Sequence, residues 1–301
     1  MFHLRRNIRL NMNSRKQPNK RNRKSLQKGD KRQKTAATGM PPAPSPAKTP
    51  AGTVPPERWL FGFHAVSAAL ANPKRQCKRL FLTADAARRT DDLFKNADQN
   101  GVDRSSLNIV RAERAEIERL LPPNAVHQGI ALDCHPLAAP ELGDVSYPLD
   151  QGPDIIVVLD QVTDPHNVGA ILRSAASFGA RAVIMQARNA PPDTGTLAKS
   201  ASGALEIVPI VRVSNLSRTL ETLADQGYWR IGLTADAKLN LSQADPGRRV
   251  VLVLGAEGSG LRRLTAQNCD ILCKLPMAAS TSVTSLNVSN AAAVALYELI
   301  R

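Results

Sequence analysis

Three polar segments, residues 160–169, 255–260 and 275–290, each follow an apolar run and contain the side chains best suited to chemistry. Those side chains are Asn167, Arg173 just beyond the first segment, Glu257, Ser285 and Asn287. The set offers amide, guanidinium, carboxylate and hydroxyl groups and has no cysteine nucleophile. It therefore suits positioning and electrostatic work at a phosphate or ribose better than hydrolysis through a catalytic triad.

Simpler roles explain part of this set. An ordinary strand-to-helix turn accounts for the first segment except Arg173, and Ser285 or Asn287 suits a helix cap. The glycines of the second segment lack the GxGxxG spacing and the lysine of a P-loop, which disfavours a nucleotide-phosphate cradle. His166 is a weaker acid–base candidate, because Asp164 is its only identifiable carboxylate partner.

Alternating strands and helices must position these segments. Six short apolar runs predict strands at 155–159, 182–185, 207–211, 229–233, 250–254 and 271–275. Helical patterns separate them at 168–178, 216–226, 261–268 and 288–300. This alternation predicts an α/β domain with a mostly parallel sheet covered on both faces. Ligands in such sheets bind beyond the carboxyl ends of the strands, where the polar segments lie.

The chain divides into four parts by composition. Residues 1–57 are a basic, proline-rich tail without apolar periodicity, which predicts disorder. Residues 58–135 read as a small α/β domain, with strands at 79–83, 107–110 and 129–133 and helices at 91–99 and 111–121. Four prolines and two glycines indicate a linker at 136–153. The larger domain is expected at 154–301.

Most of the net charge of +14 lies in the tail, where residues 1–57 contain 14 Lys and Arg but only Asp30 and Glu57 as acids, a net +12. A mobile polycation attracts phosphates without sequence preference. A solubilising leader and a mitochondrial transit peptide are the alternatives. No secretory signal or transmembrane run is present, so we expect a cytoplasmic protein with no membrane partner. The four cysteines are scattered and no zinc site is suggested, so we expect no metal.

The three polar segments resemble the three motifs of SpoU-type (TrmH-like) RNA 2′-O-ribose methyltransferases of the SPOUT superfamily. The motif residues are Asp164–Gly169 with Arg173–Ala175, then Leu254–Gly258, then Leu275–Met277 with Ser285–Ser289. Upstream, Phe61–Val66 and His127–Ile130 resemble the substrate-binding domain found in this family, whose fold is similar to that of ribosomal protein L30e. The motifs occur in the family's order, which makes the resemblance specific.

The resemblance implies a carboxy-terminal trefoil knot that holds S-adenosylmethionine, with cofactor contacts at Gly255, Leu275 and Leu286. It also implies a homodimer and a guanosine of 23S ribosomal RNA as the target. Arg173 would bind phosphate and stabilise the developing alkoxide, with Glu257 orienting it. Ser285 and Asn287 would fix the donor loop and the nucleotide, and Asn167 belongs to the same catalytic set.

The third motif departs from the family in one respect. Relatives usually have five residues, one of them glycine, between its methionine and Ser-Leu-Asn, whereas residues 278–284 number seven and contain no glycine. Because lengthening a loop costs little free energy, we expect the insertion to bulge into solvent.

Three other functions stay open for the protein: a noncatalytic RNA-binding protein with an altered donor site, a tRNA methyltransferase, or a dehydrogenase. The missing fingerprint glycines weaken the last.

Overall fold

Two β-sheets organise the chain in the computed structural model, which describes residues 55, 58–149, 151–193, 195–278 and 285–301. The first sheet has the strand order β1-β4-β2-β3 and the second the order β7-β6-β5-β10-β8-β11-β9. Apart from Pro55, the predicted basic tail lies outside the described residues, as do residues 279–284 of the third-motif insertion. No described helix has the length and apolarity needed to cross a membrane.

The four-stranded sheet is built from residues 59–134. Its strands are β1 (Trp59–Phe61), β2 (Cys77–Leu82), β3 (Asn108–Arg111) and β4 (Ile130–Cys134). Its helices are α1 (Phe63–Ala71), α2 (Ala84–Ala87), α3 (Thr90–Gln99) and α4 (Arg114–Leu120). β4 pairs antiparallel with both β1 and β2, and β2 pairs parallel with β3. β1 was not among the predicted strands, because three residues are too short to show a period of two.

The seven-stranded sheet is parallel throughout its described pairings, which confirms the predicted fold class. Its strands are β5 (Asp154–Asp160), β6 (Ala182–Gln186), β7 (Ile210–Val213), β8 (Trp229–Leu233), β9 (Leu239–Asn240), β10 (Arg249–Gly255) and β11 (Ile271–Lys274). Its principal helices are α6 (Pro165–Ser177), α8 (Leu216–Asp225), α9 (Arg263–Gln267) and α10 (Val288–Ile300). β5 lies near the centre, between β6 and β10.

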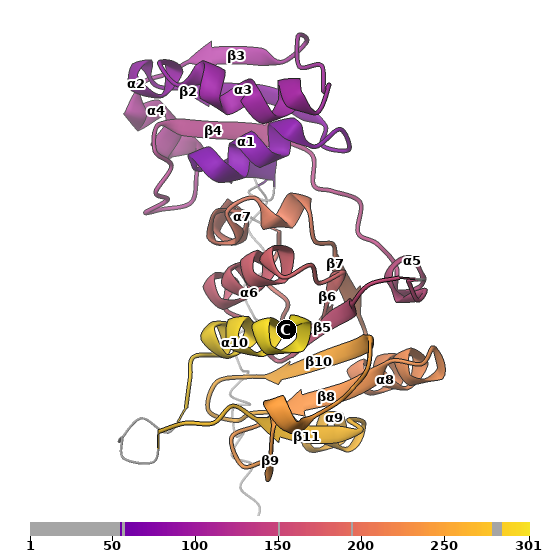
Figure 1. Cartoon of the computed structure of the whole chain (residues 1–301). Helices are drawn as coiled ribbons and strands as arrows, with labels where there is room; N and C mark the ends of the chain where they lie inside the picture. Colours follow the sequence, from indigo (N-terminus) through magenta and orange to yellow (C-terminus); the bar gives the residue numbers. More distant parts are fainter. Residues whose placement is uncertain (1–54, 56–57, 150, 194, 279–284) are drawn as a thin grey trace, which may run out of the picture. The chain divides into compact units, whose positions relative to one another are not determined.

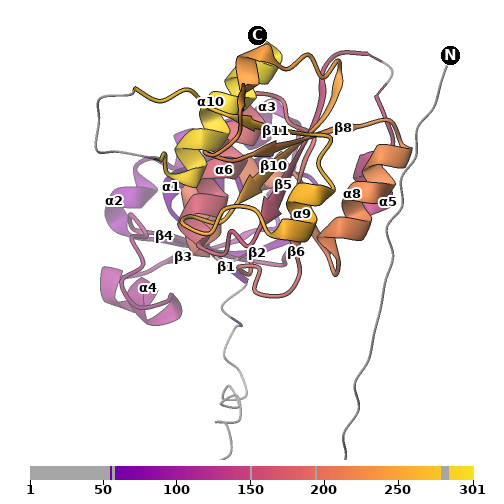
Figure 2. The same ribbon diagram turned by 90° about the horizontal axis from the view of Figure 1, so that it is seen from below.

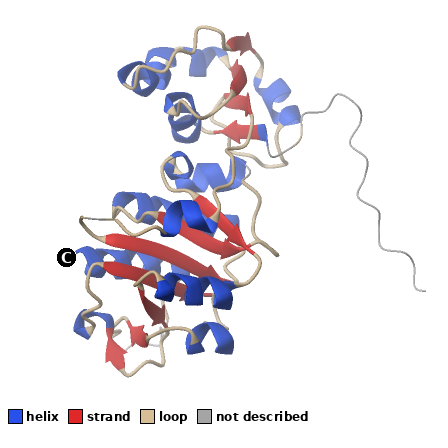
Figure 3. Cartoon of the chain, turned by 90° about the vertical axis from the view of Figure 1, so that its right-hand side faces the viewer, coloured by secondary structure: helices blue, strands red, loops and turns tan. Residues whose placement is uncertain are grey.

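Both faces of β5 are buried, because successive side chains point to opposite sides of a strand. Ile155, Val157 and Leu159 join one apolar cluster, whereas Ile156 and Val158 join another. Figures 1 and 2 show α6 and α10 on one face of the sheet and α8 and α9 on the other. Figure 3 shows the strands of the sheet in red and the helices that cover it in blue. This two-sided burial explains why the strands are uninterrupted apolar runs.

Several elements differ from the sequence reading. Helix α7 (Gly195–Ala201) and the 3₁₀ helix η2 (Ala204–Glu206) occupy a stretch with no apolar periodicity. The strand expected at 207–211 begins instead at Ile210, because η2 extends through Glu206 and leaves Ile207 exposed. Helix α5 (Leu142–Ser146) forms within the predicted linker, where Val145 packs into the α8-side cluster. β9 and the 3₁₀ helix η3 (Leu241–Gln243) were also not expected.

A buried ion pair joins the two sheet-forming parts of the chain. Arg75, which precedes β2, pairs with Glu206 of η2, and their side chains are 3% and 5% exposed. Asn72 also donates a hydrogen bond to Glu206, at 2.8 Å. Nearby, Gly195 lies so close to Phe61 that a Cβ there would sit 2.2 Å from the ring. Both contacts require residues far apart in the sequence.

Candidate active site

The β5–α6 connection is fixed at its helical end. Asp164 caps α6 by accepting a hydrogen bond from the His166 backbone N–H at 3.0 Å, and Pro165 occupies the first helical turn. At Gly169, α6 packs tightly on α7, because a Cβ there would lie 2.4 Å from Cβ of Ser200. Asn167 therefore lies on a first helical turn that is held by the Asp164 cap and by the packing of α6 on α7.

The β10–α9 connection is the second rigid loop. A Cβ on Gly255 would lie 2.2 Å from the Gly260 backbone carbon, so only glycine permits this close approach. Gly258 and Gly260 adopt φ angles of 81° and 65°. Farther on, Arg262 donates from its backbone N–H and its Nε to the buried carboxylate of Asp160, at 2.9 and 2.6 Å. These contacts hold Glu257 beside β5.

Asn287 begins α10 and serves two purposes at once. Its Oδ1 accepts hydrogen bonds from the backbone N–H groups of Ser289 and Asn290, at 2.9 and 3.4 Å, as an N-cap. Its Nδ2 stays available and points out of the helix to other loops. The capping role expected from sequence is therefore real, and it fixes the amide for a second contact.

The three loops meet in one hydrogen-bonded cluster formed by Asn167, Glu257 and Asn287. Nδ2 of Asn287 donates to Oδ1 of Asn167 at 3.0 Å and also to Oε1 of Glu257. Nδ2 of Asn167 lies 3.5 Å from the same Glu257 oxygen, which also accepts from the Val288 backbone N–H at 3.3 Å. Residues 120 positions apart in sequence thus become neighbours, as the strand-end argument predicted.

Arg173 and Ser285 are exposed and stand outside this cluster. Glu257 was expected to orient Arg173, but its carboxylate accepts from the two asparagines instead. Within the described residues the Arg173 guanidinium has no hydrogen-bond or ion-pair partner. His166 faces α7, with its Nδ1 3.1 Å from the Ser200 hydroxyl. The structure thus brings together three of the five predicted catalytic residues and leaves a free guanidinium two turns along α6.

The predicted cofactor residues Gly255, Leu275 and Leu286 belong to the second and third loops. Leu275 is half-buried, and Leu286 and Met277 expose apolar side chains in an otherwise polar segment, at 38% and 41%. The loop folded on Gly255 and these apolar groups fit a methyl donor that carries an adenine ring and a charged amino-acid end. The threading of a knot stays a prediction, since residues 279–284 lie outside the described part.

Other chemistries find little support in the site. Burial raises the pKa of the Cys134 and Cys269 thiols to about 12, so neither is a thiolate nucleophile near neutral pH. Among the described residues, no group of three His, Cys, Asp or Glu side chains is arranged to hold a metal ion. The predicted catalytic side chains are two amides, one carboxylate, one guanidinium and one hydroxyl.

Two family models match the chain in the order that the sequence suggests. Residues 59–140 match the RNA 2′-O ribose methyltransferase substrate-binding family, and residues 154–297 match the SpoU rRNA methylase family. The chain belongs to the SpoU rRNA methylase family. All three motif loops of the candidate active site lie within the methylase match.

Curated relatives in this family are similar over most of their length. The 23S rRNA (guanosine-2′-O-)-methyltransferase RlmB of Pseudomonas syringae pv. tomato is 40% identical over 245 residues, covering 80% of this chain and 94% of the relative. The RlmB of Ralstonia nicotianae is 42% identical over 243 residues, with the same two coverages.

Solved SpoU structures share the fold. The SpoU methyltransferase AviRb of Streptomyces viridochromogenes, in complex with AdoMet, superposes with a TM-score of 0.63 at 24% identity, covering 80% of this chain and 88% of that one. A putative TrmH-family RNA methyltransferase of Porphyromonas gingivalis gives 0.62 at 25% identity over the same shares. The expected family and two-part α/β architecture are thereby confirmed.

Sequence reasoning missed two residues that shape the site. Asp160 ends β5 and Arg262 precedes α9, and their ion pair joins the first loop to the second across 102 positions. Asp160 offered one signal, because an acidic residue that ends a wholly apolar strand needs a partner when buried. Nothing local identifies Arg262 among the neighbouring arginines.

Proposed function

We propose that this protein transfers a methyl group from S-adenosylmethionine to a ribose 2′-oxygen of a guanosine in 23S ribosomal RNA. The observation that carries the proposal is the hydrogen-bonded cluster of Asn167, Glu257 and Asn287, formed by the three SpoU motif loops. The rRNA and guanosine assignments are supported by the RlmB relatives, which act on that substrate. A noncatalytic or tRNA-directed role has no comparable support.

The donor supplies an activated methyl on its sulfonium, and the protein's task is to align the ribose oxygen with it. Asn167 and Asn287 present fixed amides at the edge where the loops meet, with Glu257 as their shared acceptor. These groups orient the ribose and hold the donor loop without needing to reorganise during the reaction. Ser285, exposed two positions before Asn287, contributes a hydroxyl to the nucleotide.

Arg173 is the group that stabilises charge. A guanidinium stays protonated at any physiological pH, so it binds phosphate and stabilises the developing alkoxide rather than removing the proton. Its lack of an ion-pair partner among the described residues leaves all of its donors available to the RNA. A planar fork also suits the two oxygens of a phosphate.

Methyl transfer to deproteinised 23S rRNA, prepared from cells lacking the native modification, tests this function. The full chain with labelled S-adenosylmethionine is expected to modify one guanosine, located by reverse-transcription stops at low nucleotide concentration. Calorimetric titration with S-adenosylmethionine is the companion measurement. Donor binding without incorporation points to a noncatalytic protein, and incorporation into tRNA alone overturns the rRNA assignment.

The domains divide the RNA contacts. Residues 58–135 present cations with aromatic support, such as Arg89, whose guanidinium lies 3.9 Å from the Phe63 ring centroid. Residues 136–153 link this domain to the methylase domain at 154–301, and the tail 1–57 adds non-specific attraction to phosphates.

Deleting the tail is expected to flatten the salt dependence of RNA binding while leaving donor affinity unchanged. An unchanged salt slope identifies the tail as a leader.

The protein acts as a cytoplasmic homodimer through the outer side of α10. Val294, Tyr297 and Ile300 are large apolar side chains on this helix with exposures of 48%, 54% and 40%, and Tyr297 packs edge-on against Phe178. Such a face is typical of a subunit contact. Light scattering measures it directly: Tyr297→Glu is expected to give monomers, and a wild-type monomer at micromolar concentration excludes the dimer.

A further inference from the structure

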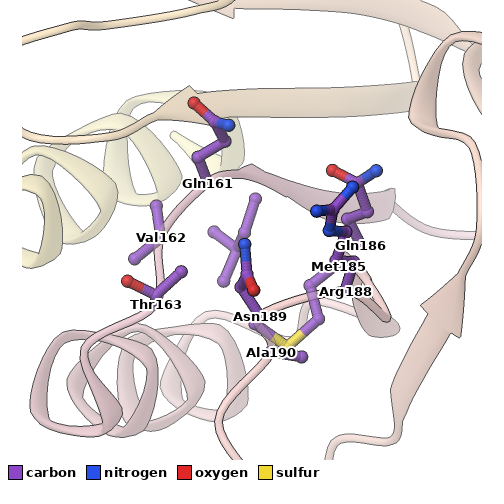
Figure 4. Close-up of a pocket in the computed structure, with 9 residues that line it drawn as sticks. Gln161, Val162, Thr163, Met185, Gln186, Arg188, Asn189 and Ala190 are labelled. Atoms are coloured by element: carbon purple, nitrogen blue, oxygen red, sulfur yellow. The ribbon is translucent and has the colours of Figure 1, made fainter. Parts of the chain in front are cut away.

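A cavity of about 80 Å³ opens at the carboxyl ends of β5 and β6, beside the candidate active site (Figure 4). Its apolar lining comes from Leu159, Val162 and Met185, all at most 5% exposed. In Figure 4, Val162 and Thr163 stand on one side and Met185 and Arg188 on the other. A small apolar floor with polar groups above it is typical of a ligand site.

Four of the five polar side chains that line the cavity have no partner among the described residues. The side chains of Gln161, Thr163, Arg188 and Asn189 line the cavity, and none of them hydrogen-bonds or pairs with another described residue. Gln161 and Asn189 also have backbone φ angles of 61° and 66°, in the left-handed region that residues other than glycine rarely adopt. Two such residues on neighbouring loops, both lining one cavity, are held there by the surrounding structure.

The wall after β6 is anchored from β7. Arg212 forms an ion pair with Asp193 at 2.6 Å and donates to the Pro191 carbonyl at 3.1 Å. Gln186 donates to the Ser214 carbonyl at 3.4 Å. The opposite wall is fixed by buried Val162 and by the Asp164 cap of α6. The cavity is therefore preformed between two anchored loops.

The strand order places the cavity near the hydrogen-bonded cluster of Asn167, Glu257 and Asn287. β5 lies between β6 and β10. The β10 loop brings Glu257 to Asn167 on one side of the β5–α6 connection, and the cavity lies on its β6 side. Neighbouring strands are about 4.8 Å apart, so cavity and cluster are separated by roughly one or two strand spacings. That separation matches the span of a nucleoside from ribose to the far edge of its base.

We propose that this cavity binds the base of the nucleotide whose ribose is methylated and selects guanine, an inference that rests on the proposed function. Guanine presents acceptors at O6 and N7, for which an arginine fork is the best-matched side chain. Arg188 is free to supply that fork. The carboxamide oxygens of Gln161 and Asn189 accept from the guanine amino group, and the apolar floor receives the ring. RNA bases are commonly read in this unstacked form.

The test compares two exposed arginines that have no ion-pair partner in the described chain. Arg188 lines the cavity, whereas Arg218 lies on α8 away from it. Arg188→Ala and Arg218→Ala are assayed by single-turnover methylation of a 23S rRNA fragment carrying guanosine at the target, and of the same fragment with adenosine there. Donor affinity is measured for each variant.

Arg188→Ala is expected to lower the guanosine rate by about 10–100-fold, the range for losing one bidentate base contact, with the adenosine rate and donor affinity nearly unchanged. Arg218→Ala is expected to change neither rate by more than about twofold. Asn189→Gly, which suits the positive φ, keeps the fold and is expected to give a smaller loss of discrimination. An unchanged guanosine-to-adenosine ratio in Arg188→Ala overturns the inference while the proposed function stands. Absence of transfer by the wild type overturns both.

Discussion

The two ends of β5 each hold a buried aspartate, and they do different work. At the amino end, Asp154 accepts from the Tyr228 hydroxyl at 2.7 Å and the Leu149 backbone N–H at 2.8 Å, with Arg181 at 3.4 Å. At the carboxyl end, Arg262 is the one residue in the described part of the chain whose hydrogen bonds the Asp160 side chain accepts. Both carboxylates are fully buried.

The two aspartates differ in what their partners hold in place. The partners of Asp154 tie the end of the linker, the residue before β6 and the residue before β8 into one packed edge. The partner of Asp160 instead anchors a loop whose Glu257 reaches Asn167 and Asn287. A buried carboxylate is therefore no marker of function by itself. The site arises where an anchored loop presents further polar groups to solvent.

The largest effect at the carboxyl end is expected from Arg173→Ala. Removing one preorganised charge-stabilising donor typically costs about 10²–10³ in rate, so single-turnover methylation is expected to fall by that factor while donor affinity changes little. Arg173→Lys is expected to recover little, because a point charge cannot reproduce the planar fork. A folded Arg173→Ala protein that methylates at near wild-type rate removes Arg173 from the mechanism.

Asp160→Asn comes next, because it keeps the side-chain size and removes the charge that holds Arg262. The Glu257 loop then loses its anchor, and displacements of about 1 Å cost up to about 10²-fold in rate. Both donor affinity and single-turnover rate are expected to fall. If they stay at wild-type values while the free energy of unfolding drops, Asp160 is as purely structural as Asp154.

Tyr228→Phe probes the amino end as the matched case. It removes a hydrogen bond to a buried carboxylate, worth about 1.5–3 kcal/mol, so urea unfolding is expected to show that loss. The methylation rate of the folded protein is expected to stay within about twofold of wild type. A large loss of rate without a loss of stability would mean that the two ends are coupled.

The smallest effect is expected from deleting Ser280 and Thr281, which restores the spacing usual in the family. These residues are small and polar and lie outside the described part of the chain. Donor affinity measured by calorimetry is expected to match the full-length value. Loss of binding, with the circular dichroism spectrum intact, assigns the insertion to the shape of the donor pocket.

Most of the methylase sheet was predictable, because strands buried on both faces are continuous apolar runs bounded by turns. The meeting of Asn167, Glu257 and Asn287 also followed from strand ends that share one edge. Helix α7 was missed because its residues, Gly195–Ala201, show no periodicity and are buried by Phe61 and α6 rather than by a local pattern. The Asp160–Arg262 pair was missed because a buried acid indicates the need for a partner, but across 102 positions no local pattern identifies that partner.

The Arg75–Glu206 pair has a consequence for how this gene tolerates recombination. If the first domain is exchanged for that of a distant relative without a cation at position 75, the buried Glu206 carboxylate is left without its ion-pair partner. Breaking a buried pair in that way costs about 3–5 kcal/mol, a large part of the stability of an ordinary domain. A productive chimaera must therefore carry arginine and glutamate together, or replace both with apolar residues. This pair thus makes the stability of each part depend on the other, although they read as separate domains in the sequence.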